Sequence, residues 1–263
     1  MPDLAVVTAA LEHLAPLRLA AAWDSVGLLV APRSGGVERV MTCLTLTPEV
    51  AAEAVRERVD LVVSHHPLPF RPIARLTSAT GPGRVLLDLI HAGAGVWSSH
   101  TAWDSAAGGI NDQLAHLLGL ASIAPLEPDA ELPQVGFGRA GTAAANATVA
   151  DLAARAAQAL GLEHVQLAGD PARAAGRVGI VCGSGGDCVE QVWRGGCDTL
   201  FTGEIKLHQA TEALAAGMAV VAVGHHASEH FSMAVLAERL AAAVPGLFCQ
   251  ASRDERDPLG WLA

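Results

Sequence analysis

Two pairs of adjacent histidines each follow an apolar stretch of this chain. His65 and His66 come after residues 60–64, and His225 and His226 come after residues 218–224. Short apolar runs of this kind are typical of buried strands. Because ligands bind at the carboxyl ends of strands in open α/β sheets, both pairs are candidate ligand-binding residues.

Further histidines and carboxylates accompany these pairs. Of the 11 histidines, seven lie in four short clusters: His65, His66, His100, His208, His225, His226 and His230. Asp104 follows His100 by four residues, and Glu229 follows His225 by four. Neutral imidazole is the commonest protein ligand for divalent transition metals, and carboxylates offset the charge of the cation. The pattern predicts a metal site with ligands from distant parts of the chain.

Each of these residues also has a purely structural interpretation. Glu229 could be a first-turn acid in a helix that Ser228 caps, and Asp104 could cap a helix. Neighbouring residues of a strand point to opposite faces. His65 and His66 can therefore share one ion only if the chain turns between them; otherwise each serves a different ion. We expect His230 at the surface or in packing.

The segments around these residues predict an α/β scaffold. Strands are expected at 37–47, 61–64 and 95–99, and helices at 48–59 and 84–91. Thr47 is a suitable N-cap and Pro48 a suitable first residue for the helix at 48–59. The order of strand, helix and strand implies a parallel unit with His65 and His66 at its carboxyl edge.

The second part of the chain repeats this alternation. Helices are expected at 149–160, 206–216 and 229–243, and strands at 164–167, 178–182, 199–202 and 219–223. Residues 183–186 (Gly-Ser-Gly-Gly) are expected to form a plain turn, since they lack the phosphate-loop pattern. Proline and acidic residues at 125–133 suggest a boundary between an N-terminal half, 1–126, and a C-terminal half, 127–263.

Composition excludes several classes of protein. With 17 basic and 27 acidic residues the net charge is −10, which disfavours binding to nucleic acid. The 5 cysteines form no C-x-x-C pair, which suits a reducing compartment. No signal-peptide pattern and no apolar stretch of membrane-spanning length is evident. We therefore expect a cytoplasmic protein with no membrane partner.

Five motifs, in the same order, resemble those of one family, the type 2 GTP cyclohydrolase I group, also called the Nif-three-like proteins. Residues 23–28 resemble its W-D-N-x-G-L, residues 65–67 its H-H-P, and residues 100–104 its H-T-N-x-D. Residues 202–204 resemble its T-G-E, and residues 224–229 its G-H-x-x-[ST]-E. The family's asparagines are replaced by Ser25 and Ala102, which fall on no expected ligand.

This resemblance implies a dinuclear metal centre with Glu229 as a plausible bridge, held by five ligands: His65, His66, Asp104, His225 and Glu229. It implies two intertwined α/β halves with mixed, largely parallel sheets and the site in the cleft between them. It also implies a ring-shaped homohexamer of short-form chains. The ligand set suits two ions of Zn, Fe, Mn, Co or Ni.

The implied activity is metal-dependent hydrolysis, specifically opening of the GTP purine ring at C8 with release of formate. His100, Glu204 and His226 are the expected proton-shuttling residues. Two alternatives stay open from the sequence. One is a noncatalytic hexameric adaptor or regulator with a structural or sensory metal site. The other is a hydrolase of a different nucleotide, phosphoester or amide.

Overall fold

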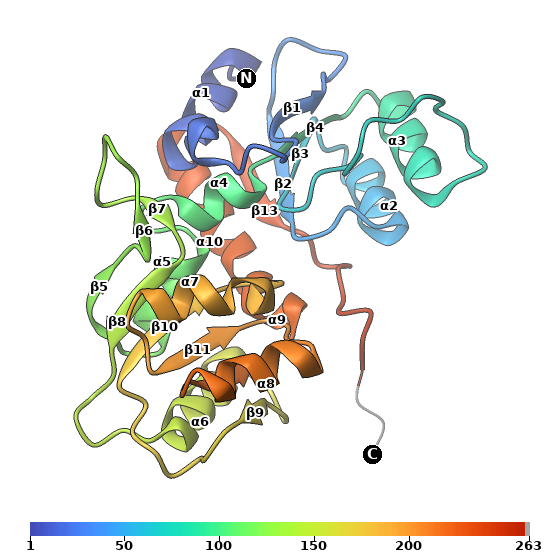
Figure 1. The fold of residues 1–263 in the computed structure, drawn as a ribbon. Coiled ribbons are helices and arrows are strands. Elements are labelled where there is room, and N and C mark those ends of the chain that lie inside the picture. The colour runs from blue at the N-terminus through green and yellow to red at the C-terminus, as the bar shows by residue number, and fades with distance from the viewer. Residues whose placement is uncertain (261–263) are drawn as a thin grey trace. The chain divides into compact units, whose positions relative to one another are not determined.

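The chain forms two units and passes through them in the order one, two, one (Figure 1). Our computed structural model describes residues 1–260. Unit 1 comprises Met1–Trp103 and the stretch from Ser232 onward, and unit 2 is Asp104–Phe231. The boundary expected at 126/127 thus falls inside unit 2, and the last residues of the expected C-terminal half, 261–263, lie outside the described residues.

Unit 1 contains a five-stranded sheet. Its order is β1 (Gly27–Val30), β4 (Gly95–Ser98), β3 (Leu61–Ser64), β2 (Arg39–Cys43) and β13 (Phe248–Ala251). All neighbours are parallel except β1, which runs antiparallel to β4. Because β13 pairs with β2, the last stretch of the chain returns to the first unit.

Helices cover this sheet. Those of unit 1 are α1 (Leu4–Leu14), α2 (Pro48–Arg56) and α3 (Gly81–Ala92), while α4 (His100–Ser105) and α10 (Phe231–Ala243) begin in one unit and end in the other. The buried residues of α2 and α3 pack on Met41, Val62 and Val96, which project from one face of the sheet. On β2, Thr42 donates its hydroxyl hydrogen to the Met233 carbonyl of α10 at 2.7 Å.

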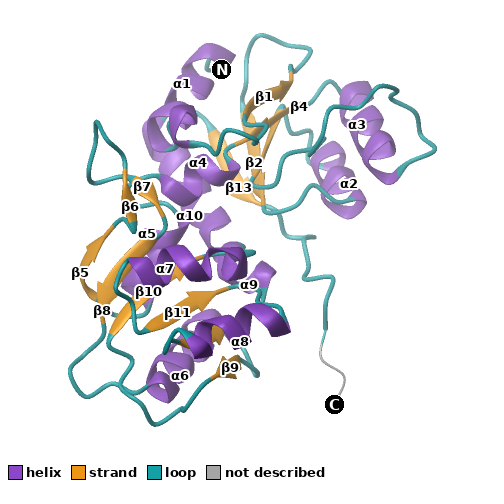
Figure 2. Ribbon diagram, viewed as in Figure 1, coloured by secondary structure: helices purple, strands orange, loops and turns teal. Residues whose placement is uncertain are grey.

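Unit 2 contains a second sheet, whose strands are orange in Figure 2. This sheet has six strands. Its order is β5 (Ala121–Ala124), β8 (Arg139–Thr142), β10 (Arg177–Val181), β11 (Thr199–Thr202), β12 (Ala219–Ala222) and β9 (Gln166–Ala168). The neighbours β10, β11 and β12 are parallel, and the other three strands join antiparallel. A ribbon of β6 (Glu127–Pro128) and β7 (Gly136–Phe137) lies outside this sheet.

The helices of unit 2 lie between these strands in the sequence. They are α5 (Ile110–Leu117), α6 (Val149–Leu160), α7 (Val189–Arg194), α8 (Leu207–Ala215) and α9 (His225–Glu229). A core cluster joins the sheet to α7 and α8 through Val192, Leu200 and Ala213. No helix among residues 1–260 combines the length and apolar character needed to cross a membrane.

The expected fold class, α/β with mixed and mostly parallel sheets, is confirmed. The strands at 61–64 and 199–202 and the helix at 149–160 have the expected bounds. The helix expected at 229–243 differs, because α9 already begins at His225 and α10 follows from Phe231. Gly224 precedes α9 with a φ of +90°, a conformation that favours glycine, so the chain turns into the helix directly after β12.

Candidate metal centre

The chain turns at the end of β3, and this turn brings two adjacent histidines together. The backbone N–H groups of His65 and His66 donate to the Cys43 and Leu44 carbonyls, each at 2.8 Å. In a regular parallel strand, consecutive amides point to opposite neighbours, so two consecutive bonds toward the same neighbour mark a departure from the strand. The ring centroids of His65 and His66 are 5.1 Å apart. The turn that a shared site requires is therefore present.

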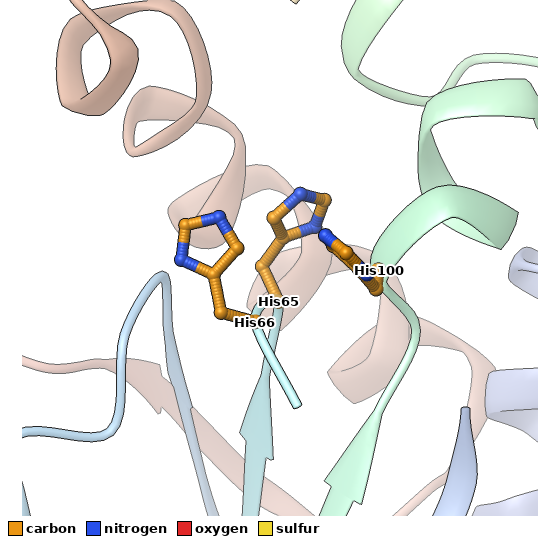
Figure 3. Close-up of side chains that lie close together, drawn as sticks. All are labelled: His65, His66 and His100. Atoms are coloured by element: carbon orange, nitrogen blue, oxygen red, sulfur yellow. The ribbon is translucent and has the colours of Figure 1, made fainter. Parts of the chain in front are cut away.

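His100, at the start of α4, completes a cluster of three imidazoles with His65 and His66. Its ring centroid lies 5.2 Å from that of His65 and 5.5 Å from that of His66. Figure 3 shows the three rings together, with His65 between the other two in this view. One nitrogen from each ring lies within 4.8 Å of the others. His100 has a φ of +24°, a conformation uncommon for a non-glycine residue, which is typical of positions held for function.

Oxygen atoms from two other segments orient the outer rings of this cluster. The Thr45 hydroxyl lies 2.8 Å from His66 Nδ1, and the Asp24 carboxylate lies 2.8 Å from His100 Nδ1. The same Asp24 accepts from the Thr101 hydroxyl at 2.5 Å and from the Thr101 amide at 3.2 Å. Metal-binding histidines ordinarily donate their second ring nitrogen to such an oxygen. The contacts thus direct Nε2 of both rings toward the cluster.

Asp24 is held in its charged form. Burial alone would raise its pKa, but the hydrogen bonds from His100 and Thr101 outweigh burial and leave the pKa below its usual value. The carboxylate side chain is fully buried at 0% exposure, whereas His100 is 12% exposed. A buried negative charge beside an imidazole favours the N–H on Nδ1 and increases the basicity of Nε2.

Asp24→Asn is expected to weaken metal binding by about 10- to 100-fold, the usual effect of removing a carboxylate that orients a ligating histidine. The amide keeps the shape of the side chain but loses the charge that holds the Nδ1–H tautomer of His100. Competition with a chelator, using Zn²⁺ or Co²⁺, measures the change. An unchanged affinity would show that His100 needs no orientation by Asp24.

The second histidine pair lies in α9 of unit 2, where His225 contacts two carboxylates. Its Nε2 lies 3.1 Å from Glu229 Oε2, and its Nδ1 lies 3.4 Å from Glu204 Oε2. Glu229 is 3% exposed, so its charge is largely removed from water. The hydrogen bond to Glu229 raises the pKa of His225 to about 9 against the opposing effect of burial, and Glu204 adds to the rise. Binding of a cation here would displace a proton from His225.

Backbone close to α9 makes room for the Glu229 carboxylate. Gly183 has a φ of +58°, and a Cβ at this position would clash with Glu229 Oε1. The Gly183 amide donates to the Ser228 hydroxyl at 2.9 Å, and that hydroxyl donates to the His225 carbonyl at 2.8 Å. The turn after β10, expected to be plain, therefore borders the candidate ligand Glu229.

Asp104, the remaining expected ligand, lies in α4 and contacts Cys182, the residue that follows β10. The Cys182 thiol donates to Asp104 Oδ1 at 3.3 Å, and Asn111 donates to the Asp104 carbonyl at 3.1 Å. Burial raises the pKa of Cys182 well above its usual value, and the charges of Asp104 and Glu229 raise it further. Both carboxylates therefore act on the same thiol, and the thiol stays protonated beside them.

Within each unit the structure brings several of the expected residues together. His65, His66 and His100 form one group in unit 1. In unit 2, His225 contacts both Glu229 and Glu204. His226 stacks instead on His230, with centroids 4.4 Å apart and an interplanar angle of 17°. His208 is exposed and belongs to neither group.

Several residues of the site had no role assigned from sequence. Asp24 was evident only as part of a motif, while Thr45 and Gly183 gave no local signal beyond an expected strand and an expected turn. Their roles depend on contacts with residues 21 to 76 positions away, such as Thr45 with His66 and Asp24 with His100.

The donor atoms of these groups fit a divalent transition metal. Three imidazoles with ligand atoms within 4.8 Å of one another provide the nitrogen donors that Zn, Fe, Co and Ni prefer. In unit 2, Glu229 is almost completely buried and offers a negative charge to a cation beside His225. The residues present could hold metal and could activate water or polarise a substrate beside it.

The chain is similar to known proteins over nearly its whole length. The model of the family Duf34/NIF3 (NGG1p interacting factor 3) matches residues 2–258. A GTP cyclohydrolase 1 type 2 homolog of Streptomyces coelicolor is 35% identical over 87% of this chain and 82% of its own length. A homolog of the same name from Lactococcus lactis is 30% identical over 94% of this chain and 95% of its own. The crystal structure of a Bacillus cereus protein related to NIF3 shares the fold, with a TM-score of 0.91, 20% identity and 99% coverage of both chains.

Proposed function

The chain belongs to the Duf34/NIF3 family, and we propose that it is a metal-dependent hydrolase with a dinuclear centre. The proposed ligands are His65, His66, Asp104, His225 and Glu229. The observation that carries the proposal is the cluster of imidazoles at the end of β3, whose ligand atoms lie within 4.8 Å of one another. We propose two divalent ions per chain, of a transition metal such as Zn, Fe, Mn, Co or Ni.

Two such ions, when bound, would lower the pKa of a water molecule and polarise the substrate. The side chains around them have the arrangement of proton carriers. Asp24 fixes Nδ1 of His100, so Nε2 can act either as the proton carrier expected from the sequence or as a ligand in addition to the five. The metal affinity of Asp24→Asn distinguishes the two roles. Glu204 lies 3.4 Å from His225 and is 50% exposed, which suits exchange of protons with solvent. His226, the third expected carrier, stacks on His230.

We propose GTP, or a nucleotide close to it, as the substrate, with opening of the purine ring and release of formate. The names of the relatives support this assignment. Two exposed aromatic side chains beside His100 also support it. Trp23 is 65% exposed and Phe70 52%, and their centroids lie 5.9 Å and 6.1 Å from that of His100. Aromatic faces of this kind stack on planar heterocycles, which a simple phosphoester or amide lacks.

Formate release from GTP by the metal-loaded protein tests the activity. Glu229→Gln is expected to lower the rate by about 10²-fold or more, because it removes the negative charge of a proposed ligand and the partner of His225. Glu190→Gln is the matched control, since Glu190 is exposed and contacts Arg194 one turn away. Its rate should equal that of the wild type.

Absence of formate from the fully metal-loaded wild type would contradict the GTP assignment. A panel of other nucleotides, phosphoesters and small amides then decides whether another substrate is hydrolysed. We propose a cytoplasmic homohexamer as the working assembly, measured by native mass spectrometry. A metal-loaded hexamer that turns over none of the panel would identify the protein as a noncatalytic adaptor or regulator.

A further inference from the structure

The segment that follows β13 is tied to the connection between β2 and α2. The Ser252 amide donates to the Thr42 carbonyl at 2.8 Å, which continues the pairing of β13 with β2. Three residues later, Glu255 turns its carboxylate into unit 1 and is only 5% exposed. A buried carboxylate is costly unless hydrogen bonds satisfy it. The backbone of unit 1 provides two such bonds.

Both bonds come from the two consecutive amides that directly follow β2. The Leu44 N–H donates to Glu255 Oε2 at 2.8 Å, and the Thr45 N–H donates to Glu255 Oε1 at 2.6 Å. One carboxylate thus uses both oxygens to fix two successive peptide groups. Hydrogen bonds to a charged acceptor are about twice as strong as neutral ones, so this contact restrains the local backbone firmly.

The restrained peptide groups are those that contact His66. The Leu44 carbonyl accepts from the His66 amide at 2.8 Å, and the Thr45 hydroxyl lies 2.8 Å from His66 Nδ1. Glu255, Thr45 and His66 therefore form a continuous chain of hydrogen bonds through the Thr45 backbone. This chain connects position 255 to a candidate metal ligand at position 66.

We propose that Glu255 is a positioning residue for the metal centre, because it fixes Thr45 so that His66 presents Nε2 as the ligand atom. When the Thr45 oxygen accepts from Nδ1–H, the lone pair of the imidazole is on Nε2. Without the hydrogen bonds from the Leu44 and Thr45 amides to Glu255, the Thr45 hydroxyl could rotate. His66 would then occur as a mixture of its Nδ1–H and Nε2–H tautomers. This inference rests on the proposed function, since it concerns the same metal site.

Glu53 provides a natural control for this proposal. Its carboxylate is 1% exposed and holds the same C-terminal segment, but through the amides of Arg253 and Asp254 and the hydroxyl of Ser252. The hydrogen bonds of Glu53 attach the segment to α2, whereas those of Glu255 reach the residues beside His66. Both residues are buried carboxylates, so the same isosteric substitution can be made at each.

Glu255→Gln is expected to lower Co²⁺ affinity by about 10- to 100-fold, as for other groups that orient a ligating histidine. One of the two amides would then face the side-chain NH₂, which donates and cannot accept. Titration followed by the visible spectrum of Co²⁺ reports affinity and ligand geometry together. Glu53→Gln should leave the Co²⁺ affinity and spectrum unchanged, even where it lowers the melting temperature.

The hydroxyl of Thr45 should show the same dependence. Thr45→Val is expected to weaken Co²⁺ binding as much as Glu255→Gln, whereas Thr45→Ser should retain wild-type affinity because it keeps the oxygen. The double variant Glu255→Gln/Thr45→Val should bind no more weakly than either single variant, since both act through one chain of contacts. Additive losses, or equal losses in the Glu53 and Glu255 variants, would overturn the proposal.

A measurement without metal separates this inference from the proposed function. Nitrogen-15 NMR of the metal-free protein at alkaline pH reports the tautomer of His66. The wild type should show mainly the Nδ1–H form, and Glu255→Gln a mixture. If the wild type binds no Co²⁺ but its His66 tautomer still differs from that of Glu255→Gln, the proposed metal centre is contradicted and the positioning role of Glu255 is not. An unchanged tautomer in Glu255→Gln would contradict the positioning role, whatever the metal result.

Discussion

Replacing His65 with alanine is expected to remove most of the bound metal. The His65 ring lies 5.1 Å from that of His66 and 5.2 Å from that of His100, so its removal takes one of the three possible nitrogen ligands from the imidazole cluster. Loss of a group that merely orients a ligand weakens binding by about 10- to 100-fold, and loss of a ligand should exceed that range. We therefore expect at least about a 100-fold lower affinity for Zn²⁺ or Co²⁺, with substoichiometric metal after dialysis.

His91→Ala is the control for this substitution. His91 is exposed in the last turn of α3 and belongs to neither candidate metal group, so its loss should leave the metal content unchanged. His65 is 1% exposed, and its truncation also leaves a cavity. Melting of the metal-free proteins measures that separate effect. Full metal occupancy in His65→Ala would contradict the assignment of His65 as a ligand.

The part of the site around His65 could be predicted because its signals are local. Thr47, Pro48 and Glu49 specify the start of α2, and the apolar residues 61–64 specify β3. A helix of this length between two strands forces a parallel crossover, which places the following residues at the carboxyl edge. Residues 47–66, a stretch of about 20, therefore predict both the imidazole ligands and their place at the edge of the sheet.

Contacts between residues far apart in the sequence were not predictable in this way. Strand β13 was not expected, because Phe248–Ala251 is short and its pairing partner β2 is about 200 residues earlier. The roles of Glu53 and Glu255 follow from that pairing, since β13 positions the segment they hold. A lone glutamate in a helix or near a terminus has no local pattern that distinguishes a buried anchor from a solvated charge.

The boundary between the two units could not be predicted from the sequence either, because it too depends on contacts between distant residues. The acidic, proline-containing residues 125–133 suggested a boundary, but they belong to β6 and the loop before β7 in unit 2. The actual transitions occur within α4 and α10, two helices with no break in composition. Composition marks exposed loops, whereas unit boundaries depend on which elements pack together.

Arg139 is a second buried group whose role depends on distant contacts. It is 1% exposed, and its guanidinium donates to both oxygens of Asp112 at 2.5 Å and 3.1 Å. It also donates to four backbone carbonyls, those of Ser105, Ala106, Gly136 and Gly138. Arg139 thus joins β8 and α5 to the end of α4, next to the candidate ligand Asp104.

Arg139→Met is expected to lower the free energy of unfolding by about 3 to 5 kcal/mol, the usual result of removing one partner from a buried ion pair. Asp112 would keep a partly buried charge, and each of the four carbonyls would lose its hydrogen bond from the guanidinium. Urea unfolding measures the loss, and Arg194→Met is the control. Arg194 is exposed and pairs with Glu190 one turn away, so its removal should cost at most about 0.5 kcal/mol.

The two variants should also differ in metal binding. The Ser105 and Ala106 carbonyls directly follow Asp104, so loss of Arg139 would release the backbone that carries this ligand. Arg139→Met should therefore weaken Co²⁺ binding under conditions where it is still folded, while Arg194→Met should not. An exposed ion pair contributes at most about 1 kcal/mol. If the free energy of unfolding of Arg139→Met lies within that amount of the wild-type value, the buried network around Arg139 is not required for stability.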